Sequence, residues 1–306
     1  MSNQIKTTVL LAALTAFIIW IGQVLGGRQG MVIALVLAAG MNFFSYWYSD
    51  KIVLKMYHAR EATRQQAPEV FDIVGRLTQN AGLPMPKIFI IPSEAPNAFA
   101  TGRNPENAVV AVTDGLLRLM NRQEIAGVLA HELAHVKNRD ILIGSIAATL
   151  AGAIMLLANM ARWSMIFGGG RDDKNGGSGI VGLLFMSILA PMAAMIIQMA
   201  ISRSREYQAD ATGAAISGNP EALASALEKL GATSGRLPMN ASPSTAHMLI
   251  VNPLSGRNLM NLFSTHPPLQ DRIARLRGLS GSTPATPPSR EPGRDSARAF
   301  WDRLSK

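Results

Sequence analysis

"GVLAHELAHVKNRDILIGSIAATLAGAIML", residues 127–156, joins two different kinds of sequence. Its first part, up to Asp140, holds two histidines among several charged residues, whereas residues 141–161 contain no charged residue. A spanning helix needs about 20 predominantly apolar residues, so the second part is long enough to cross a membrane. The stretch therefore predicts a helix with polar, chemically useful side chains that leads directly into a membrane span.

Three other runs of the chain also lack charged residues, namely 7–27, 29–49 and 175–202, and within the last run we place the span at 180–201. Buried helices of soluble proteins seldom stay uncharged on every face for such lengths. The composition agrees, because 48% of the residues are hydrophobic and the mean hydropathy is +0.17. We predict a mainly α membrane protein with four hydrophobic helices in two hairpins.

The runs divide the chain into five parts. Residues 1–50 are expected to form the first transmembrane hairpin and residues 140–202 the second. Two polar segments, 51–139 and 203–280, are expected to fold outside the membrane. The tail, 281–306, is rich in Pro, Ser and Arg, a composition typical of disorder.

The first polar segment is expected to contain a small sheet. "APEVFDIVGRLTQNAG" predicts a helix that ends at Gly82, and β-branched residues predict strands over 87–92 and 108–112. Between these strands, "NAFATG" (Asn97–Gly102) is bounded by prolines, which sheets tolerate at their edges. We therefore predict an edge strand over 97–102.

The net charge of +9 does not indicate nucleic-acid binding, because of where the basic residues lie. They gather beside the ends of the hydrophobic runs, at Lys51, Lys55, Lys137, Arg139, Arg203 and Arg205. Cytoplasmic ends of membrane helices carry such an excess of Lys and Arg. We predict a lipid bilayer as partner, no nucleic acid, and a cytoplasmic location for both termini and both polar segments. Arg203 and Arg205 are interpreted as anchors at the membrane edge.

The histidines of the opening stretch are spaced to hold a metal ion. Asn121 is a good N-cap and Glu124 completes a capping box, which predicts a helix from residue 122 to about 138. His131 and His135 then lie one turn apart on one face, and both imidazoles can reach one zinc ion. Glu132 lies beside them, where it can address a water at the metal without binding the metal itself.

Charged residues on both sides of the histidines place this helix relative to the membrane. Arg122 and Glu124 precede the motif, and Lys137, Arg139 and Asp140 follow it. Charges are expensive in hydrocarbon, so the motif is expected at the membrane surface and not within the bilayer. The uncharged span begins near residue 141.

A catalytic zinc site needs a third protein ligand. The chain has no cysteine, which excludes disulfides and thiolate ligands and leaves His58, His247, His266 and several carboxylates. We favour Glu206, because it directly follows the last span and so emerges on the same side as the histidines. Asp210, one helical turn further, is placed to accept a hydrogen bond from a ligating imidazole.

Four motifs together, "HELAH", "SREYQAD", "NAFATG" and "FSTHPPLQDRI", resemble the HtpX family of bacterial membrane-bound zinc metalloproteases, relatives of the CAAX prenyl endopeptidases. The resemblance extends to about residue 280 and leaves out the tail. It implies a zincin-like α+β metalloprotease domain with a small sheet, formed by 51–139 and 203–280. It also implies a multi-pass protein of the bacterial inner membrane that acts in protein quality control and the stress response. Other quality-control proteases of the membrane are possible partners.

The resemblance also assigns roles to residues. It implies one Zn²⁺ per subunit held by His131, His135 and Glu206, with Glu132 as general base and acid. It implies that His266 stabilises the oxyanion and that Arg272 supports the transition state through its charge. The substrate cleft is then lined by the edge strand, that is by Asn97, Ala98, Phe99, Ala100, Thr101 and Gly102.

The function expected from these features is that of a zinc metalloendopeptidase. It would be anchored in the membrane and cleave misfolded or damaged membrane proteins and unfolded polypeptides on the cytoplasmic side. A prenyl-protein endopeptidase is an alternative, but it needs a chamber for the isoprenoid, usually built from more than four spans. A scaffold or chaperone with a structural zinc is another, although Glu132 would then serve no purpose. The charges beside the motif exclude an intramembrane protease.

Overall fold

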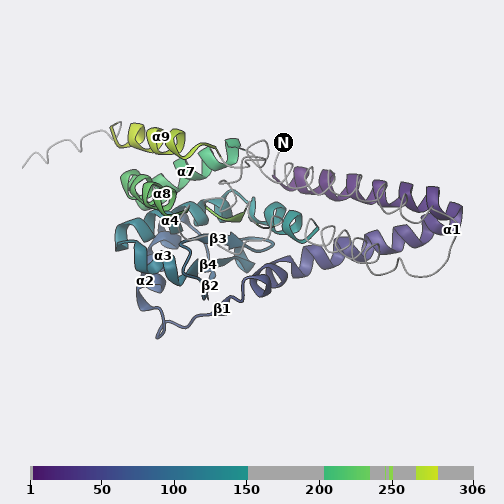
Figure 1. Cartoon of the computed structure of the whole chain (residues 1–306), viewed down its shortest axis with the longest axis horizontal. Coiled ribbons are helices and arrows are strands. Elements are labelled where there is room, and N and C mark those ends of the chain that lie inside the picture. The colour runs from purple at the N-terminus through teal and green to yellow at the C-terminus, as the bar shows by residue number, and fades with distance from the viewer. Residues whose placement is uncertain (1–2, 151–202, 235–244, 246–247, 251–266, 282–306) are drawn as a thin grey trace, which may run out of the picture.

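The computed structural model describes residues 3–150, 203–234, 245, 248–250 and 267–281, and the statements below concern these residues. The fold is mostly helical, with a small mixed sheet in a globular body from which a helical hairpin extends (Figure 1). The elements are α1 (Asn3–Met56), β1 (Arg60–Glu61), α2 (Pro68–Ala81), β2 (Lys87–Ile91), β3 (Ala98–Thr101), η1 (Pro105–Asn107), β4 (Val109–Thr113), α3 (Asp114–Leu119), α4 (Arg122–Lys137), the apolar helix Ile141–Leu150, α7 (Arg203–Ser217), α8 (Pro220–Ser234) and α9 (Leu269–Gly281).

Helix α1 folds back on itself and forms the hairpin seen in Figure 1. Gly27 has a φ of +57°, a left-handed conformation that glycine adopts readily. The side-chain amide of Asn42 donates a hydrogen bond of 2.8 Å to the Thr15 hydroxyl, 27 positions away in sequence. On a straight helix these residues would lie about 40 Å apart. The two uncharged runs of the N-terminal part therefore lie in two antiparallel arms.

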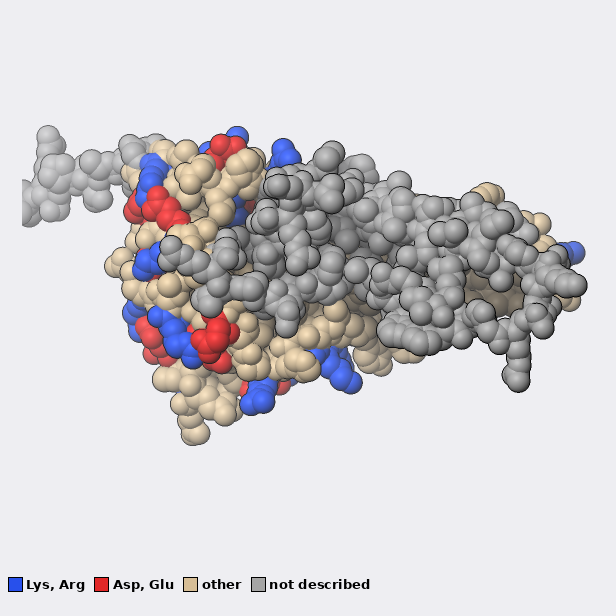
Figure 2. Space-filling model, in the orientation of Figure 1, with Lys and Arg blue, Asp and Glu red and all other residues tan. Residues whose placement is uncertain are grey.

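The second arm, Gly27–Met56, is long and apolar enough to cross a membrane, and among the described residues it is the single helix that is so. It exposes large apolar side chains that include Val36, Leu37, Phe43 and Phe44. On the face shown in Figure 2, charged side chains gather on the globular body, and the few parts of the hairpin that are visible beside the undescribed atoms are mostly uncharged. Of the second predicted hairpin, residues 151–202 lie outside the described residues, so the count of four spans stays a prediction.

The apolar helix Ile141–Leu150 packs against the hairpin rather than standing apart from it. Ile143, Ile146 and Leu150 are buried and contact Leu11 and Met41 of the two arms. The chain thus leaves α4 and enters an apolar helix after three residues, as the opening stretch predicts.

The four strands have the order β1–β2–β4–β3. The central strands β2 and β4 are parallel, whereas β1 is antiparallel to β2 and β3 is antiparallel to β4. The predicted edge position of β3 is confirmed. The Thr113 N–H donates to the Asn97 carbonyl, so residue 97 turns its backbone groups toward β4. Backbone direction alternates along a strand, and therefore Ala98 and Ala100 direct their N–H and C=O groups away from the sheet. The strand offers these groups on its outer edge.

Helix α4 lies at the centre of the body, in contact with α2, α7, α8 and β3. The predicted capping box is confirmed, because the Asn121 side chain accepts from the Glu124 N–H while the Glu124 carboxylate accepts from the Asn121 N–H. Glu124 also accepts from Ser225 and Lys229 of α8, which fixes the start of α4 to its neighbour. Leu129 and Leu133 are fully buried, and the burial of each such side chain stabilises the fold by about 1.5–3 kcal/mol.

The helix predicted to end at Gly82 is α2, for which Gly82 forms a left-handed C-cap. The strands predicted over 87–92 and 108–112 are β2 and β4, each within one residue at its ends. Local signals thus locate the elements of the first polar segment well.

Candidate metal centre

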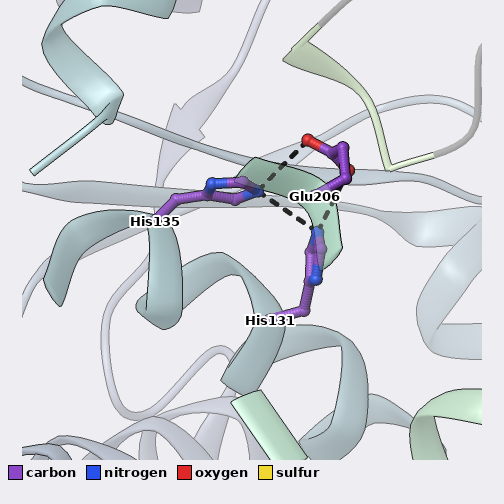
Figure 3. A group of neighbouring side chains, drawn as sticks. All are labelled: His131, His135 and Glu206. Carbon is purple, nitrogen blue, oxygen red and sulfur yellow. Dashed lines mark hydrogen bonds and ion pairs between the residues drawn. The ribbon is translucent and has the colours of Figure 1, made fainter. Parts of the chain in front are cut away.

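Three side chains from two helices converge at one point (Figure 3). His131 and His135 come from successive turns of α4, and Glu206 comes from the first turn of α7. The two Nε2 atoms lie 3.2 Å apart, and the Glu206 carboxylate oxygens lie 3.7 Å from each of them. One ligand atom from each of the three residues lies within 4.8 Å of the other two.

These distances fit a single small cation. Zinc bonds to nitrogen and oxygen at about 2.0–2.1 Å, so ligand atoms of a tetrahedral site lie about 3.3 Å apart. The separations of 3.2 and 3.7 Å need only a small contraction to meet that value. Two histidines and a carboxylate are also the kind of donor set found in catalytic zinc sites, where a fourth position is left for water.

The outer nitrogen of each histidine determines which tautomer the ring adopts. His131 Nδ1 lies 3.0 Å from the Asp210 carboxylate, and His135 Nδ1 lies 3.1 Å from the Asp140 carboxylate. A carboxylate accepts hydrogen bonds, so both Nδ1 atoms carry the proton. Once His135 has released its Nε2 proton, the lone pairs of both Nε2 atoms point toward each other and toward Glu206. Such an arrangement of lone pairs and negative charge calls for a cation between them.

Arg272 of α9 provides the counter-charge behind the ligands. Its side chain is fully buried and donates two hydrogen bonds to Asp210, from Nε at 2.9 Å and from Nη2 at 2.7 Å. Its Nη1 lies 3.7 Å from Glu206. A buried ion is tolerated only when it is paired, and here the guanidinium pairs with the carboxylate that orients His131.

Asp140 was expected only as one of the charges that follow the motif, and its contact with His135 was not predicted. The residue is buried, because Arg139 has a φ of +56° and turns the chain back under the end of α4. This turn brings the Asp140 carboxylate to His135. An acidic residue five positions after the second histidine was the available signal.

Arg205 was interpreted as a membrane-edge anchor, and that interpretation is wrong. It is 6% exposed, and Asp140 and Glu206 lie near enough to oppose the lowering of its pKa by burial. Arg205 directly precedes Glu206 on α7 and is buried beside it. Its charge belongs to the electrostatics of the centre.

We expect Asp140→Asn to lower the affinity for zinc about 10- to 100-fold, the usual effect of removing a carboxylate that orients a ligating histidine. The amide keeps the shape of the side chain but loses the charge that favours the Nδ1–H tautomer of His135. Competition with a chromophoric chelator measures the affinity. Asp271→Asn, at an exposed position of α9, is the matched control, and equal losses in both variants would contradict the role of Asp140.

Glu132 is buried beside the two histidines without joining the three converging ligand atoms. Its carboxylate accepts a hydrogen bond from the Ala100 N–H on the outer edge of β3. Burial raises the pKa of the Glu132 carboxyl to about 8, with His135 opposing the shift and Glu206 adding to it. The charge of a bound cation would bring that pKa back down toward neutrality, which suits a group that accepts and returns a proton.

Protons and a metal ion compete for the same imidazoles. Burial lowers the pKa of His131. Burial also acts to lower the pKa of His135, but the carboxylates of Asp140, Glu206 and Glu132 together outweigh it and raise that pKa to about 10. A metal ion binds the unprotonated Nε2, so binding at His135 must release a proton. The carboxylates around His135 attract a positive charge. They therefore favour a metal ion at this position as they favour a proton.

Close approach of α7 to α4 sets the distance between Glu206 and the histidines. A Cβ atom at Gly213 would lie 2.9 Å from the backbone N and Cα of His131, closer than real side chains allow. Gly213 is seven residues after Glu206, two turns along the same face of α7. The absence of a side chain at this position lets the two ligand-bearing helices touch.

Gly213→Ala is therefore expected to push α7 away from His131, to cost about 1–3 kcal/mol of stability as overpacking does, and to weaken zinc binding. Gly75→Ala in α2 is the control, since a Cβ there meets no atom within 4 Å and alanine favours a helix. Thermal unfolding and zinc titration of both variants test this. A Gly213→Ala protein with unchanged Tm and affinity would show that the contact is not needed.

The structure brings together most of the residues singled out from the sequence. His131, His135, Glu206, Asp210 and Arg272 form one connected cluster, and Glu132 joins it to the predicted edge strand. His266 lies outside the described residues. His58 is exposed at the end of α1 and takes no part in the cluster.

Comparison with known proteins agrees with this geometry. A model of peptidase family M48 matches residues 64–280. The chain is 66% identical to a Protease HtpX homolog from Desulfatibacillum aliphaticivorans, covering 99% of this chain and 100% of that protein. It is 58% identical to a Protease HtpX homolog from Thermococcus sibiricus, and this match covers 90% of this chain and 96% of that protein.

A solved structure shares the fold. The crystal structure of S. mikatae Ste24p matches with a TM-score of 0.50 and 21% identity, and the match covers 90% of this chain. This chain spans 65% of the length of that protein. Together with the apolar arm of α1, the relatives support a membrane metalloprotease. With its family match and its two-histidine, one-glutamate cluster, the chain belongs to peptidase family M48 and is a metallopeptidase.

Proposed function

We propose that the protein is a membrane-anchored zinc endopeptidase that cleaves extended segments of unfolded polypeptides. The observation that carries the proposal is the position of Glu132. This buried carboxylate lies near enough to His135 and Glu206 to interact with their charges, and it has a hydrogen bond to the backbone of Ala100 on β3. A structural metal site has no use for such a neighbour.

Zinc would be held by His131, His135 and Glu206, and when bound it would polarise the scissile carbonyl and acidify a water to a pKa near 7. Glu132 accepts the proton of the attacking water on its carboxylate and then delivers it to the nitrogen of the leaving amine. Asp210 and Asp140 hold the two imidazoles in the orientation that this requires. His266 is proposed to donate to the developing oxyanion, and Arg272 to stabilise that charge electrostatically.

The outer edge of β3 is proposed to align the substrate. Ala98 and Ala100 direct backbone groups away from the sheet, and an extended peptide can add to such an edge as a further strand. Recognition through main-chain hydrogen bonds depends little on side chains. The same site therefore suits many sequences, provided that they are unfolded.

The apolar hairpin is proposed to set where the enzyme works. It would anchor the protein in the bacterial inner membrane with the catalytic body and both termini in the cytoplasm. Misfolded or damaged membrane proteins and their loops would be the substrates, in protein quality control under stress and beside other membrane proteases. Confinement at the membrane raises the local concentration of such substrates around the site.

Metal-dependent cleavage tests the proposal. The protein is purified in detergent with a chelator to suppress self-digestion, and zinc is then added stepwise. We expect self-cleavage and cleavage of β-casein, an unfolded substrate, to appear on gels with zinc and to disappear with renewed chelation. Zinc binding at one ion per chain without any cleavage would instead support a zinc-stabilised scaffold.

A further inference from the structure

Part of the protein's own chain lies against the outer edge of β3. We call these residues the docked residues: Thr245, Met248, Leu249 and Ile250. Leu249 and Ile250 are almost completely buried, and Met248 is partly buried. They lie at the strand to which the proposed function assigns the substrate.

Ile250 is bound through its backbone, as a substrate residue would be. Its N–H points at two acceptors of the edge strand, the Asn97 side-chain oxygen at 3.1 Å and the Ala98 carbonyl at 3.4 Å. Its carbonyl accepts a hydrogen bond of 3.2 Å from Arg272 Nη1. One peptide residue thus has both its N–H and its C=O held by groups of the site.

This position is close to the metal ligands. The Arg272 nitrogen that holds the Ile250 carbonyl also lies 3.7 Å from the Glu206 carboxylate. On the same edge of β3, Ala98 receives Ile250 while Ala100, two residues on, donates to Glu132. A peptide laid along this edge next to the centre would need the acceptors that Ile250 now uses.

The docked residues have a second attachment, remote from the centre. The Thr245 hydroxyl and the Tyr57 hydroxyl form a buried hydrogen bond of 2.6 Å, and Leu249 packs in the same cluster as Tyr57 and Phe99. Tyr57 directly follows α1, so this attachment joins the docked residues to the base of the hairpin. None of these contacts involves a metal ligand.

We propose that Ile250 takes the place of a substrate residue and that the docked residues inhibit the enzyme until a polypeptide displaces them. The proposal rests on the proposed function. It identifies Asn97, Ala98 and Arg272 as a subsite for one peptide unit. Substrate and docked residues compete for that subsite, so the apparent affinity for substrate is reduced by the fraction of molecules in which it is accessible.

The attachment at Tyr57 allows a test that leaves the site unchanged. Thr245→Val and Tyr57→Phe each remove one hydroxyl of the buried hydrogen bond, and the double variant removes both of its partners. One such bond lost from the docked form shifts the equilibrium roughly 2- to 10-fold toward the open form. We expect KM for β-casein to fall by that factor, with kcat and zinc content unchanged.

Thr233→Val is the matched control, because it removes a threonine hydrogen bond of equal length, 2.6 Å to the Lys229 carbonyl, within α8, a helix that contains none of the docked residues. Its KM is expected to equal that of the wild type. A KM that is unchanged or raised in all three test variants would overturn the inference and make the docked residues a fixed wall of the cleft. Absence of zinc-dependent cleavage from the wild type would instead overturn the proposed function, and the inference with it.

Discussion

Glu132→Gln is expected to reduce kcat by roughly 10²–10⁴-fold, the usual contribution of general acid–base catalysis, while zinc stays bound. Glutamine has the size of glutamate and still accepts a hydrogen bond from the Ala100 N–H, so the packing between α4 and β3 is preserved. It cannot take a proton from water at neutral pH. Because Glu132 is not one of the three converging ligands, the affinity for metal should change little.

Turnover of β-casein and zinc content per chain are measured together on the same preparations. Glu69→Gln, an exposed residue of α2 that pairs with Arg122, is the control and should retain full activity. Loss of zinc from the Glu132→Gln protein would make this residue a ligand and remove its assigned role. Retention of activity with zinc bound would place the base elsewhere.

Glu206→Gln is expected to abolish zinc binding at micromolar concentrations, and hydrolysis with it. The loss should exceed about 100-fold in affinity, since groups that only orient the ligands are worth 10- to 100-fold. The amide removes the negative charge that lies 3.7 Å from both Nε2 atoms. It also leaves Arg272 with a single buried carboxylate partner, Asp210, within salt-bridge distance among the described residues.

Glu221→Gln is the control for this substitution, because Glu221 also lies in the first turn of a helix and pairs with an arginine, yet is exposed. Competition titration and the cleavage assay compare the two. Unchanged zinc affinity in the Glu206→Gln protein would show that another residue completes the centre, and residues outside the described ranges, His266 among them, would be the first candidates.

The helix that carries His131 and His135 could be predicted because its signals are local. Asn121 and Glu124 define its start within four residues, and the i, i+4 spacing alone places His131 and His135 on one face. Glu206 was predicted from the order of segments along the chain, because a predicted span that ends at about residue 201 would return the chain to the side of the histidines. The edge position of β3 followed from the prolines that bound it.

The remaining features of the site depend on tertiary contacts, which local sequence patterns do not predict. Asp140 reaches His135 because Arg139 adopts a left-handed conformation, which is uncommon for a residue with a side chain. Gly213 packs against the backbone of His131, 82 positions earlier in the sequence, and this contact leaves no space for a side chain. Ile250 lies on β3 through hydrogen bonds across more than 150 positions. Each of these is decided by tertiary structure.

The electrostatic arrangement explains why so many charges are buried around one point. Arg272 pairs with Asp210, and Asp210 and Asp140 hold the two histidines. Removing one member leaves its partner unpaired in the interior, which is strongly unfavourable. Metal binding and the stability of the body are therefore coupled, and chelation should lower the Tm as well as stop turnover.

X-ray absorption at the zinc edge of the reconstituted wild-type protein tests the central claim most directly. The account predicts one zinc per chain with four nitrogen or oxygen ligands at about 2.0–2.1 Å, two of them imidazoles, and loss of one imidazole in the His135→Ala protein. Four ligands including three or more imidazoles, or no zinc bound at the described residues, would contradict a centre built from His131, His135 and Glu206.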